Sequence, residues 1–327
     1  MERPTIALFG RPGDKQIVAV AKEVEAAGGT PIQLLLLMDE SGAPAVSIGQ
    51  NRMIWNGTDF SPIQAMYIRG TMPNTLPAMP PVMNSTMHAE WRTRYIREQE
   101  YQAFTYSFLS QLAAMGKLVI NPLTTYVDHN SKAQFYEKMR ALGFSFPRTL
   151  TTNDPAIASA FVREHKEVVV KPGIGVGSTR RLREDQLQRT EEFGRGPVTM
   201  QECINGKTVR VHVVGDTVVL SLKILTDEID SRTATKGFEY TRLSDEEEAK
   251  LAKATRALGL HFAAWDVITS PDGKIYYLDC NPGPYVMWIG PQNVSAVFRQ
   301  LAEYMIHFAR SGSITEASAR VKPYRLS

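Results

Sequence analysis

The sequence predicts an α/β protein, and its first 68 residues carry the pattern that indicates this class. Thr5 to Phe9 is a short apolar run, residues 17–24 carry apolar side chains at helical spacing, and residues 31–38 are a second apolar run. A strand, a helix and a buried strand in this order are typical of a parallel sheet with helical crossovers. Residues 65–68 form a third apolar run, so we expect an N-terminal parallel-sheet domain.

Length and composition exclude several classes of protein. The chain has 327 residues, 43% hydrophobic and 22% charged, which is typical of a folded protein of two or three domains. Its net charge of +3 is too small to indicate non-specific nucleic-acid binding. Its longest strongly apolar stretch, residues 34–38, cannot span a membrane. Without a signal peptide, a disulfide framework or a zinc motif around Cys203 and Cys280, we expect a cytoplasmic protein with no membrane or nucleic-acid partner.

The rest of the first segment contains short strands, a loop and one long helix. Residues 45–55, followed by Asn56-Gly57, predict strands joined by tight turns. Residues 71–84 are rich in Pro and Met and predict an irregular loop. Aromatic and apolar residues at helical spacing predict a helix from about 88 to 115, before a strand at 118–120.

A boundary is expected near Pro122, after which strands outnumber helices. Helices are predicted after capping residues, at Asn130, at Asp154 with its first-turn proline, and at Ser244 in a capping box with Glu247. A last helix is expected over about 294–309. The predicted strands cover residues 147–151, 168–170, 198–204, 209–214, 218–225, 262–268 and 274–279.

A lysine followed by a glycine-rich loop is the first of four features that indicate nucleotide chemistry. Lys171 ends a predicted strand and precedes Gly173, Gly175, Gly177 and Ser178. Glycine lets backbone N–H groups close over phosphate oxygens because no Cβ stands in the way. The lysine precedes the glycines, so this is not the Walker pattern. Taken alone, the loop is equally consistent with a surface turn.

Three oxygen-bearing side chains on two neighbouring strands are the second feature. Asp266 and Asp279 lie in strands that should pair through the Asp272-Gly273 turn, and Asn281 shares one face with Asp279. Hard oxygen ligands that leave room for waters and phosphates suit Mg²⁺. The alternative is an ordinary acidic hairpin.

The other two features are a polar pair on a strand and a lysine at a helix start. In the segment from Met200 to Ile204, Gln201 and Glu202 are bracketed by apolar residues, and such a strand can present its backbone to an adenine edge. We expect Cys203 to serve packing. Lys132 lies in the first turn of a predicted helix, where a cation opposes the helix dipole but suits an anionic partner. Surface positions explain both features equally well.

The order of these four features resembles the ATP-grasp superfamily over about residues 122–292. The resemblance implies an N-terminal α/β domain at 1–122, a central lobe at 123–203 and a C-terminal lobe with the metal site at 204–327. Residues 208–215 look like the arginine-bearing strand of RimK-like ligases.

Two further elements are similar to the ligases that cross-link ribosomally made peptides, the graspetide or microviridin maturases. They are Ile229-Asp230-Ser231-Arg232 and Asn281-Pro282-Gly283-Pro284.

For ATP, the resemblance implies a role for each nucleotide-binding candidate. Lys132 and Lys171 would hold the α and β phosphates, and the loop 173–178 would close over the β and γ phosphates. Residues 201–204 would line adenine, with main-chain bonds from Glu202 and Ile204.

For Mg²⁺, the resemblance assigns Asp266, Asp279 and Asn281 as ligands of one or two ions. The second ligand is usually Glu, so Asp279 is a departure with a shorter arm. Two other departures replace the family's usual Asp, namely Thr208 and Ser131.

The implied activity is an ATP-dependent carboxylate–amine or carboxylate–hydroxyl ligase that forms an acyl phosphate. Arg210, Lys223 and Arg232 would face the transferred phosphate and the acceptor carboxylate, whereas His212 is expected to be structural. The first substrate choice is a peptide or protein side chain. A RimK-like ligase that adds an amino acid to a protein or metabolite stays open, as do an ATP-grasp kinase, a nucleotide-binding protein without ligase activity, and a homo-oligomer.

Overall fold

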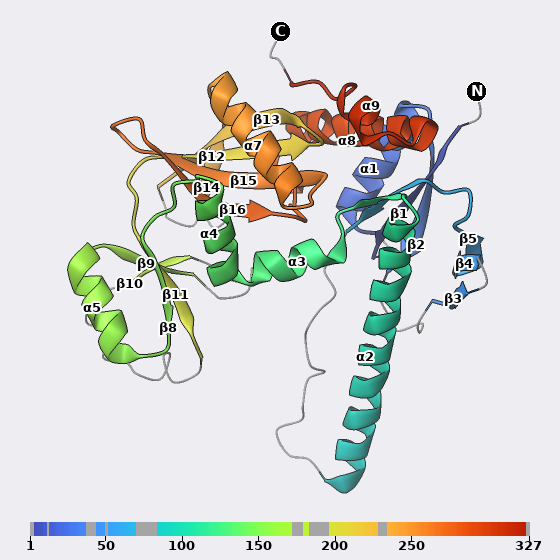
Figure 1. The fold of residues 1–327 in the computed structure, drawn as a ribbon, viewed down its shortest axis with the longest axis horizontal. Coiled ribbons are helices and arrows are strands. Elements are labelled where there is room, and N and C mark those ends of the chain that lie inside the picture. The colour runs from blue at the N-terminus through green and yellow to red at the C-terminus, as the bar shows by residue number, and fades with distance from the viewer. Residues whose placement is uncertain are drawn as a thin grey trace. The chain divides into compact units, whose positions relative to one another are not determined.

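The computed structural model describes residues 3–11, 13–36, 44–49, 52–69, 84–171, 179–182, 196–227 and 234–324 (Figure 1). The chain divides into two compact units, which are described separately. Unit 1 comprises Met1–Leu123, Gly259–His261 and Tyr285–Lys322. Unit 2 comprises Thr124–Leu258, Phe262–Pro284 and Pro323–Ser327. The division into three consecutive segments, expected from the sequence, stays a prediction.

Unit 1 is built on the expected parallel sheet, which confirms the α/β class. Its strands are β1 (Thr5–Gly10), β2 (Thr30–Leu35), β6 (Ala65–Ile68) and β7 (Leu118–Ile120). They pair in parallel in the order β2-β1-β6-β7. Helix α1 (Lys15–Ala26) packs against α8 (Pro291–Ser311), which comes from the other end of the chain and also contacts β1, β6 and β7.

A small sheet and a long helix complete most of unit 1. The sheet contains β3 (Val46–Gly49), β4 (Arg52–Trp55) and β5 (Thr58–Asp59). Helix α2 (Ser85–Ala114) confirms the expected long helix, and its buried residues all lie in its second half. There, Phe108 packs on Trp55 and Phe60 with ring centroids 4.9 and 5.2 Å away. The short helices η2 (Met287–Ile289) and α9 (Ile314–Ser318) lie on either side of α8 in the sequence.

Unit 2 begins with two helices and a four-stranded antiparallel sheet. The helices are α3 (Leu123–Asn130) and α4 (Lys132–Ala141). The expected cap at Asn130 is wrong, because Asn130 ends α3 and Ser131 occupies the N-cap of α4. The sheet has the order β10-β9-β11-β8, from β8 (Thr149–Thr152), β9 (Val168–Lys171), β10 (Arg180–Leu182) and β11 (Val198–Glu202). Helix α5 (Pro155–His165) supplies Ala158 and Val162 to the core of this sheet.

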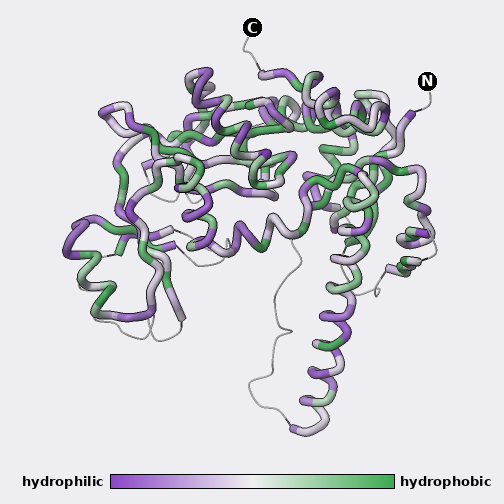
Figure 2. The backbone as a smooth tube through the Cα atoms, viewed as in Figure 1, coloured by the Kyte–Doolittle hydropathy of each residue, from purple (hydrophilic) through white to green (hydrophobic). Residues whose placement is uncertain are grey.

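A five-stranded antiparallel sheet follows, covered on one face by a helix. Its order is β14-β13-β12-β15-β16, from β12 (Lys207–Val214), β13 (Thr217–Thr226), β14 (Thr235–Thr241), β15 (Phe262–Thr269) and β16 (Ile275–Asn281). Helix α7 (Asp245–Ala257) begins at the predicted cap Ser244, which accepts the Glu247 N–H. Trp265 Nε1 donates to Thr255 Oγ1 of α7 at 2.9 Å. The sheet face from which Trp265 projects is therefore the face that α7 covers. Figure 2 shows that hydrophobic residues concentrate in the strands of this sheet.

None of the described helices combines the length and the apolarity that crossing a membrane requires.

Candidate functional site

The register of the five-stranded sheet brings Arg210, Asp266 and Asp279 onto one face. Arg210 on β12 lies opposite Asp266 on β15, and Asp266 lies opposite Asp279 on β16. Directly opposite residues project from the same face, and Asn281 joins them because it lies two residues beyond Asp279. This face is the one that α7 leaves uncovered, because Trp265 projects toward α7. The predicted pairing of the two aspartate strands is confirmed.

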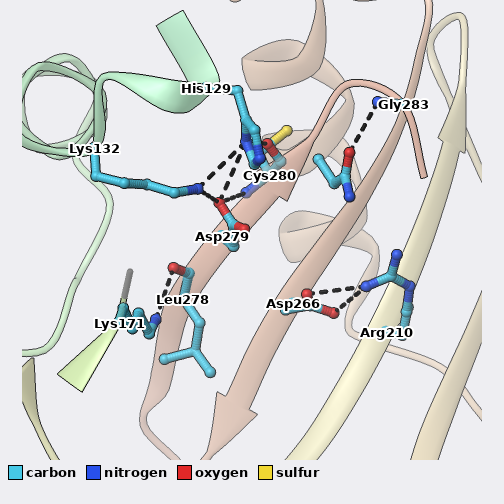
Figure 3. A network of polar contacts seen from close by, with 10 residues as sticks. His129, Lys132, Lys171, Arg210, Asp266, Leu278, Asp279, Cys280 and Gly283 are labelled. Carbon is cyan, nitrogen blue, oxygen red and sulfur yellow. Dashed lines mark hydrogen bonds and ion pairs between the residues drawn. The ribbon is translucent and has the colours of Figure 1, made fainter. Parts of the chain in front are cut away.

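The side chains of Lys132 on α4 and His129 on α3 extend to Asp279 (Figure 3). Lys132 Nζ lies 2.6 Å from Asp279 Oδ1, and the lysine side chain is buried. His129 Nδ1 lies 2.9 Å from the carbonyl oxygen of Cys280 and 3.6 Å from Asp279 Oδ1. A carbonyl only accepts, so this ring nitrogen carries a proton and donates. His129 was not predicted from the sequence, where its one signal is its place three residues before Lys132.

The charges around Asp279 determine its protonation state. Burial raises the pKa of Asp279, but Lys132 and His129 outweigh this and hold the pKa of that carboxyl well below its ordinary value. Burial lowers the pKa of His129 in spite of the attraction of Asp279, and Lys132 lowers it further. At neutral pH the site therefore contains an ionised carboxylate, a lysine and a neutral imidazole.

Asp266 has a cationic partner of its own. Arg210 Nη1 lies 2.8 Å from Asp266 Oδ1 and 2.9 Å from Oδ2, and the arginine is buried. Two carboxylates directly opposite each other repel, so the adjacent arginine and lysine offset this repulsion. The expected phosphate-facing arginine thus lies beside an expected metal ligand.

The donor set fits Mg²⁺ once other oxygens complete its shell. Among the described residues, no three His, Cys, Asp or Glu side chains gather as a metal cluster by themselves. Asp266 and Asp279 contribute carboxylates on one face, and the Asn281 amide oxygen accepts the Gly283 N–H at 2.9 Å with a second lone pair remaining. Mg²⁺ commonly takes one or two carboxylates and fills its other positions with water and phosphate oxygens.

Lys171 lies at the end of β9 beside the strand that carries Asp279. Its Nζ donates to the carbonyl oxygen of Leu278 at 3.4 Å, and its charge lowers the pKa of Asp279. The rest of the expected phosphate loop, which is Gly173, Gly175, Gly177 and Ser178, lies outside the described residues.

The expected adenine strand is β11 with the residues that follow it. The Glu202 N–H donates to the Arg148 carbonyl at 2.9 Å, and Glu202 Oε1 accepts the Arg148 N–H at 2.9 Å. Gln201 is buried and its Nε2 donates to Thr149 Oγ1 at 2.9 Å. Burial raises the pKa of the Cys203 thiol, which agrees with a packing role. Main-chain contacts with adenine stay a prediction.

Lys223 does not join the cluster, which corrects the expected convergence. It lies opposite Val209 rather than Thr208, so it projects from the face covered by α7 and pairs with Glu239 Oε2 at 2.7 Å. Counted from the Gly215-Asp216 turn without interruption, Lys223 would face Thr208 and share the face of Arg210. A register shift between His212 and Val213 moves the pairing by one residue and reverses the face.

Two sequence candidates remain, Arg232 and His212. Arg232, with the rest of Ile229 to Arg232, lies outside the described residues. His212 is fully buried, and neither ring nitrogen has a hydrogen-bond partner among the described residues. Burial and the nearby Arg210 lower the pKa of His212 to about 3, so it is neutral and suited to the structural role expected.

The part of the chain that carries this site, from His129 to Asn281, is similar in sequence to a known protein family. Residues 129–284 match the family described as ATP-grasp domain. The tetrahydromethanopterin:alpha-L-glutamate ligase of Methanocaldococcus jannaschii is 30% identical over 183 residues, which are 50% of this chain and 62% of that protein. The chain therefore spans less than two thirds of that relative.

Solved structures extend the similarity to most of the chain. The ATP-grasp ligase PsnB complexed with minimal precursor has a TM-score of 0.79 and 25% identity, covering 93% of this chain and 99% of that one. The macrocyclase MdnC from Microcystis aeruginosa has a TM-score of 0.72 and 21% identity, covering 92% and 99%. The fold is thus the ATP-grasp fold, and residues 129–284 are similar to the ATP-grasp family.

Proposed function

We propose that this protein is an ATP-dependent ligase that joins a carboxylate to an amine, or to a hydroxyl, through an acyl phosphate. One observation carries the proposal: the sheet face with Asp266, Asp279 and Asn281 also holds Arg210 and receives Lys132. Oxygen ligands and cations gathered on one face suit a nucleotide triphosphate and its metal.

In this proposal the oxygen-bearing side chains bind the metal and the cationic side chains bind the phosphates. Asp266, Asp279 and Asn281 would hold Mg²⁺, which supplies charge neutralisation at the phosphate oxygens when bound. Lys132 and Lys171 would bind phosphate oxygens, exchanging their present contacts for the nucleotide. Arg210 would stabilise the phosphoryl group during transfer, because it is held rigidly beside Asp266.

The reaction activates a poor electrophile. The substrate carboxylate takes the γ-phosphate of ATP, which leaves ADP and an acyl phosphate. An amine or hydroxyl then attacks the acyl carbon and expels phosphate. Little covalent help from the protein is needed, so positioning and charge neutralisation account for the chemistry.

A peptide or protein side chain is the proposed substrate. The support comes from PsnB, which is described with a minimal precursor, and with a phosphomimetic variant of that precursor, Mg and ADP at 26% identity to this chain. The methanogen glutamate ligase instead favours the addition of an amino acid to a metabolite, which stays the second candidate.

Trapping the acyl phosphate with hydroxylamine tests ligase chemistry without knowledge of the nucleophile. The protein is incubated with ATP, Mg²⁺, hydroxylamine and a synthetic mixture of peptides that contain Glu or Asp among neutral residues. We expect peptide hydroxamates by mass spectrometry and matching release of ADP, both abolished by Asp279→Ala. A phosphate retained on the peptide would instead identify a kinase. ADP release unaffected by Asp279→Ala would overturn the assignment of the site.

A further inference from the structure

The parallel sheet of unit 1 has a topological switch point between β1 and β6. After β1 the chain passes through α1 to β2 on one side, and it later returns to β6 on the other side. In open parallel sheets, ligands bind beyond the carboxyl ends of the strands at such a point. Arg69 directly follows β6 there, and its N–H donates to the Phe9 carbonyl of β1 at 2.7 Å.

The guanidinium of Arg69 has weak partners among the described residues. Its side chain is 22% exposed, and Nε is buried without a hydrogen-bond partner in the described part of the chain. The nearest carboxylate oxygen, Asp14 Oδ2, is 3.6 Å away, too far for a hydrogen bond. The other oxygen of Asp14 caps α1 by accepting the N–H groups of Gln16 and Ile17. A largely buried cation with an unpaired Nε donor is costly, and an anionic ligand would relieve that cost.

An aromatic ring is fixed beside this cation. The Arg69 guanidinium carbon lies 5.4 Å from the centroid of the Tyr285 ring, and Tyr285 is 46% exposed. The next residue, Val286, donates its N–H to Gln16 Oε1 at 2.9 Å, while Gln16 Nε2 donates to Tyr67 Oη at 2.7 Å. Because Gln16 is fully buried, this network holds the backbone next to Tyr285 rigidly.

We propose that Arg69 and Tyr285 bind a carboxylate of the peptide substrate, an Asp or Glu side chain. This inference rests on the proposed ligase function, because it assumes a peptide substrate. The planar fork of arginine matches a carboxylate, and the exposed tyrosine ring offers a surface for the peptide beside it. Asp14 makes a dianionic phosphate less suitable than a carboxylate, because the Asp14 carboxylate, 3.6 Å from Arg69 Nε, would repel the larger negative charge more strongly.

Direct binding tests the site without turnover. Fluorescent peptide mixtures with one Glu among neutral residues are compared with matched mixtures that carry Gln, using anisotropy. We expect the wild type to bind the Glu mixture about 10-fold or more tightly than the Gln mixture, and Arg69→Gln to lose that preference. Tyr285→Leu should weaken the Glu mixture by about 3- to 10-fold, because it removes the ring beside the cation. Because the Tyr285 side chain is 46% exposed, its replacement should not disturb the fold, so weaker binding would reflect loss of the ring.

Arg299→Gln is the matched control. Arg299 Nε lies 3.7 Å from a carboxylate oxygen of Glu23, a distance similar to that between Arg69 and Asp14, but the Arg299 side chain is 65% exposed. It should keep the wild-type preference. A wild type without preference for Glu, or an Arg69→Gln variant that retains it, overturns the inference. Hydroxamate formation separates the two proposals: if it is absent while the preference still depends on Arg69, only the ligase assignment fails. If hydroxamates form with an unchanged peptide KM in Arg69→Gln, only the carboxylate site fails.

Discussion

Replacing Lys132 with methionine removes the cation that pairs with Asp279. Lys132 Nζ lies 2.6 Å from Asp279 Oδ1, and the lysine side chain is only 6% exposed. At this distance two unit charges attract by ~6 kcal/mol at an effective dielectric constant of about 20, and desolvation of both groups offsets much of that gain. Because the change leaves a largely buried carboxylate uncompensated, we expect the free energy of unfolding to fall by ~2–4 kcal/mol.

Urea denaturation of four proteins measures this pair: the wild type, Lys132→Met, Asp279→Asn and the double variant. The double variant should be less destabilised than the sum of the single variants by ~1 kcal/mol or more, because it leaves no charge unpaired. Lys138→Met is the control on the same helix, since Lys138 contacts Asp128 at 2.7 Å but both side chains are about 40% exposed. Its expected cost is ~0–1 kcal/mol. Equal costs for Lys132→Met and Lys138→Met would refute the reasoning.

The same pair predicts a pH dependence with a definite sign. The pKa of Asp279 in the folded protein lies below its ordinary value of 3.8, so the unfolded chain binds the proton more readily. The stabilisation is therefore fully present above the ordinary pKa and is lost as the pH falls below it. In Lys132→Met the pKa of Asp279 should rise, and this part of the acid sensitivity should move to higher pH. Unfolding midpoints measured across the acidic range would show the shift.

Three further predictions concern other residues of the sheet and its surroundings. Arg210→Gln should lower kcat for ATP turnover by about 100-fold or more with a folded protein, and unchanged kcat would remove this arginine from the phosphoryl site. The pKa of His212 is lowered to about 3, so the free energy of unfolding should fall by at most ~5 kcal/mol as the pH falls from about 6.5 toward 3. In His212→Met, thermal melts measured at different pH values should show a weaker dependence of stability on pH over this range. Gly283→Ala would bring a Cβ to 2.7 Å from Tyr126 Oη and should cost ~1–3 kcal/mol, whereas Gly237→Ala meets only ordinary contact at 3.8 Å; equal melting temperatures would contradict this.

The local features of the fold were predictable because short-range patterns encode them. The apolar runs at β1, β2 and β6 predicted a parallel sheet, and the spacing of aromatic residues predicted α2. The Asp272-Gly273 turn implied that the strands of Asp266 and Asp279 pair, as they do. A tight turn leaves little choice of partner, so this part of the site followed from residues close in the chain.

The positions of two side chains, Lys223 and His129, could not be predicted from the sequence. Lys223 was expected beside Arg210, but one extra residue in β13 reverses the face on which it projects. His129 was not singled out, because its contact with the Cys280 carbonyl joins residues 151 positions apart. Neither a β-bulge nor a contact between distant segments produces a periodic pattern of residues in the sequence, so neither could be predicted from it.

By itself, the sequence determined the α/β class, the main helices and strands, and the types of side chain available for nucleotide and metal chemistry. Only the tertiary structure decided which of them meet: Lys132 with Asp279 across 147 positions, and Arg210 with Asp266. It also decided that Arg69 and Tyr285 lie together in unit 1. The physical reason is that local propensity depends on neighbours in the chain, whereas convergence of charges depends on register and packing between segments that are far apart in it.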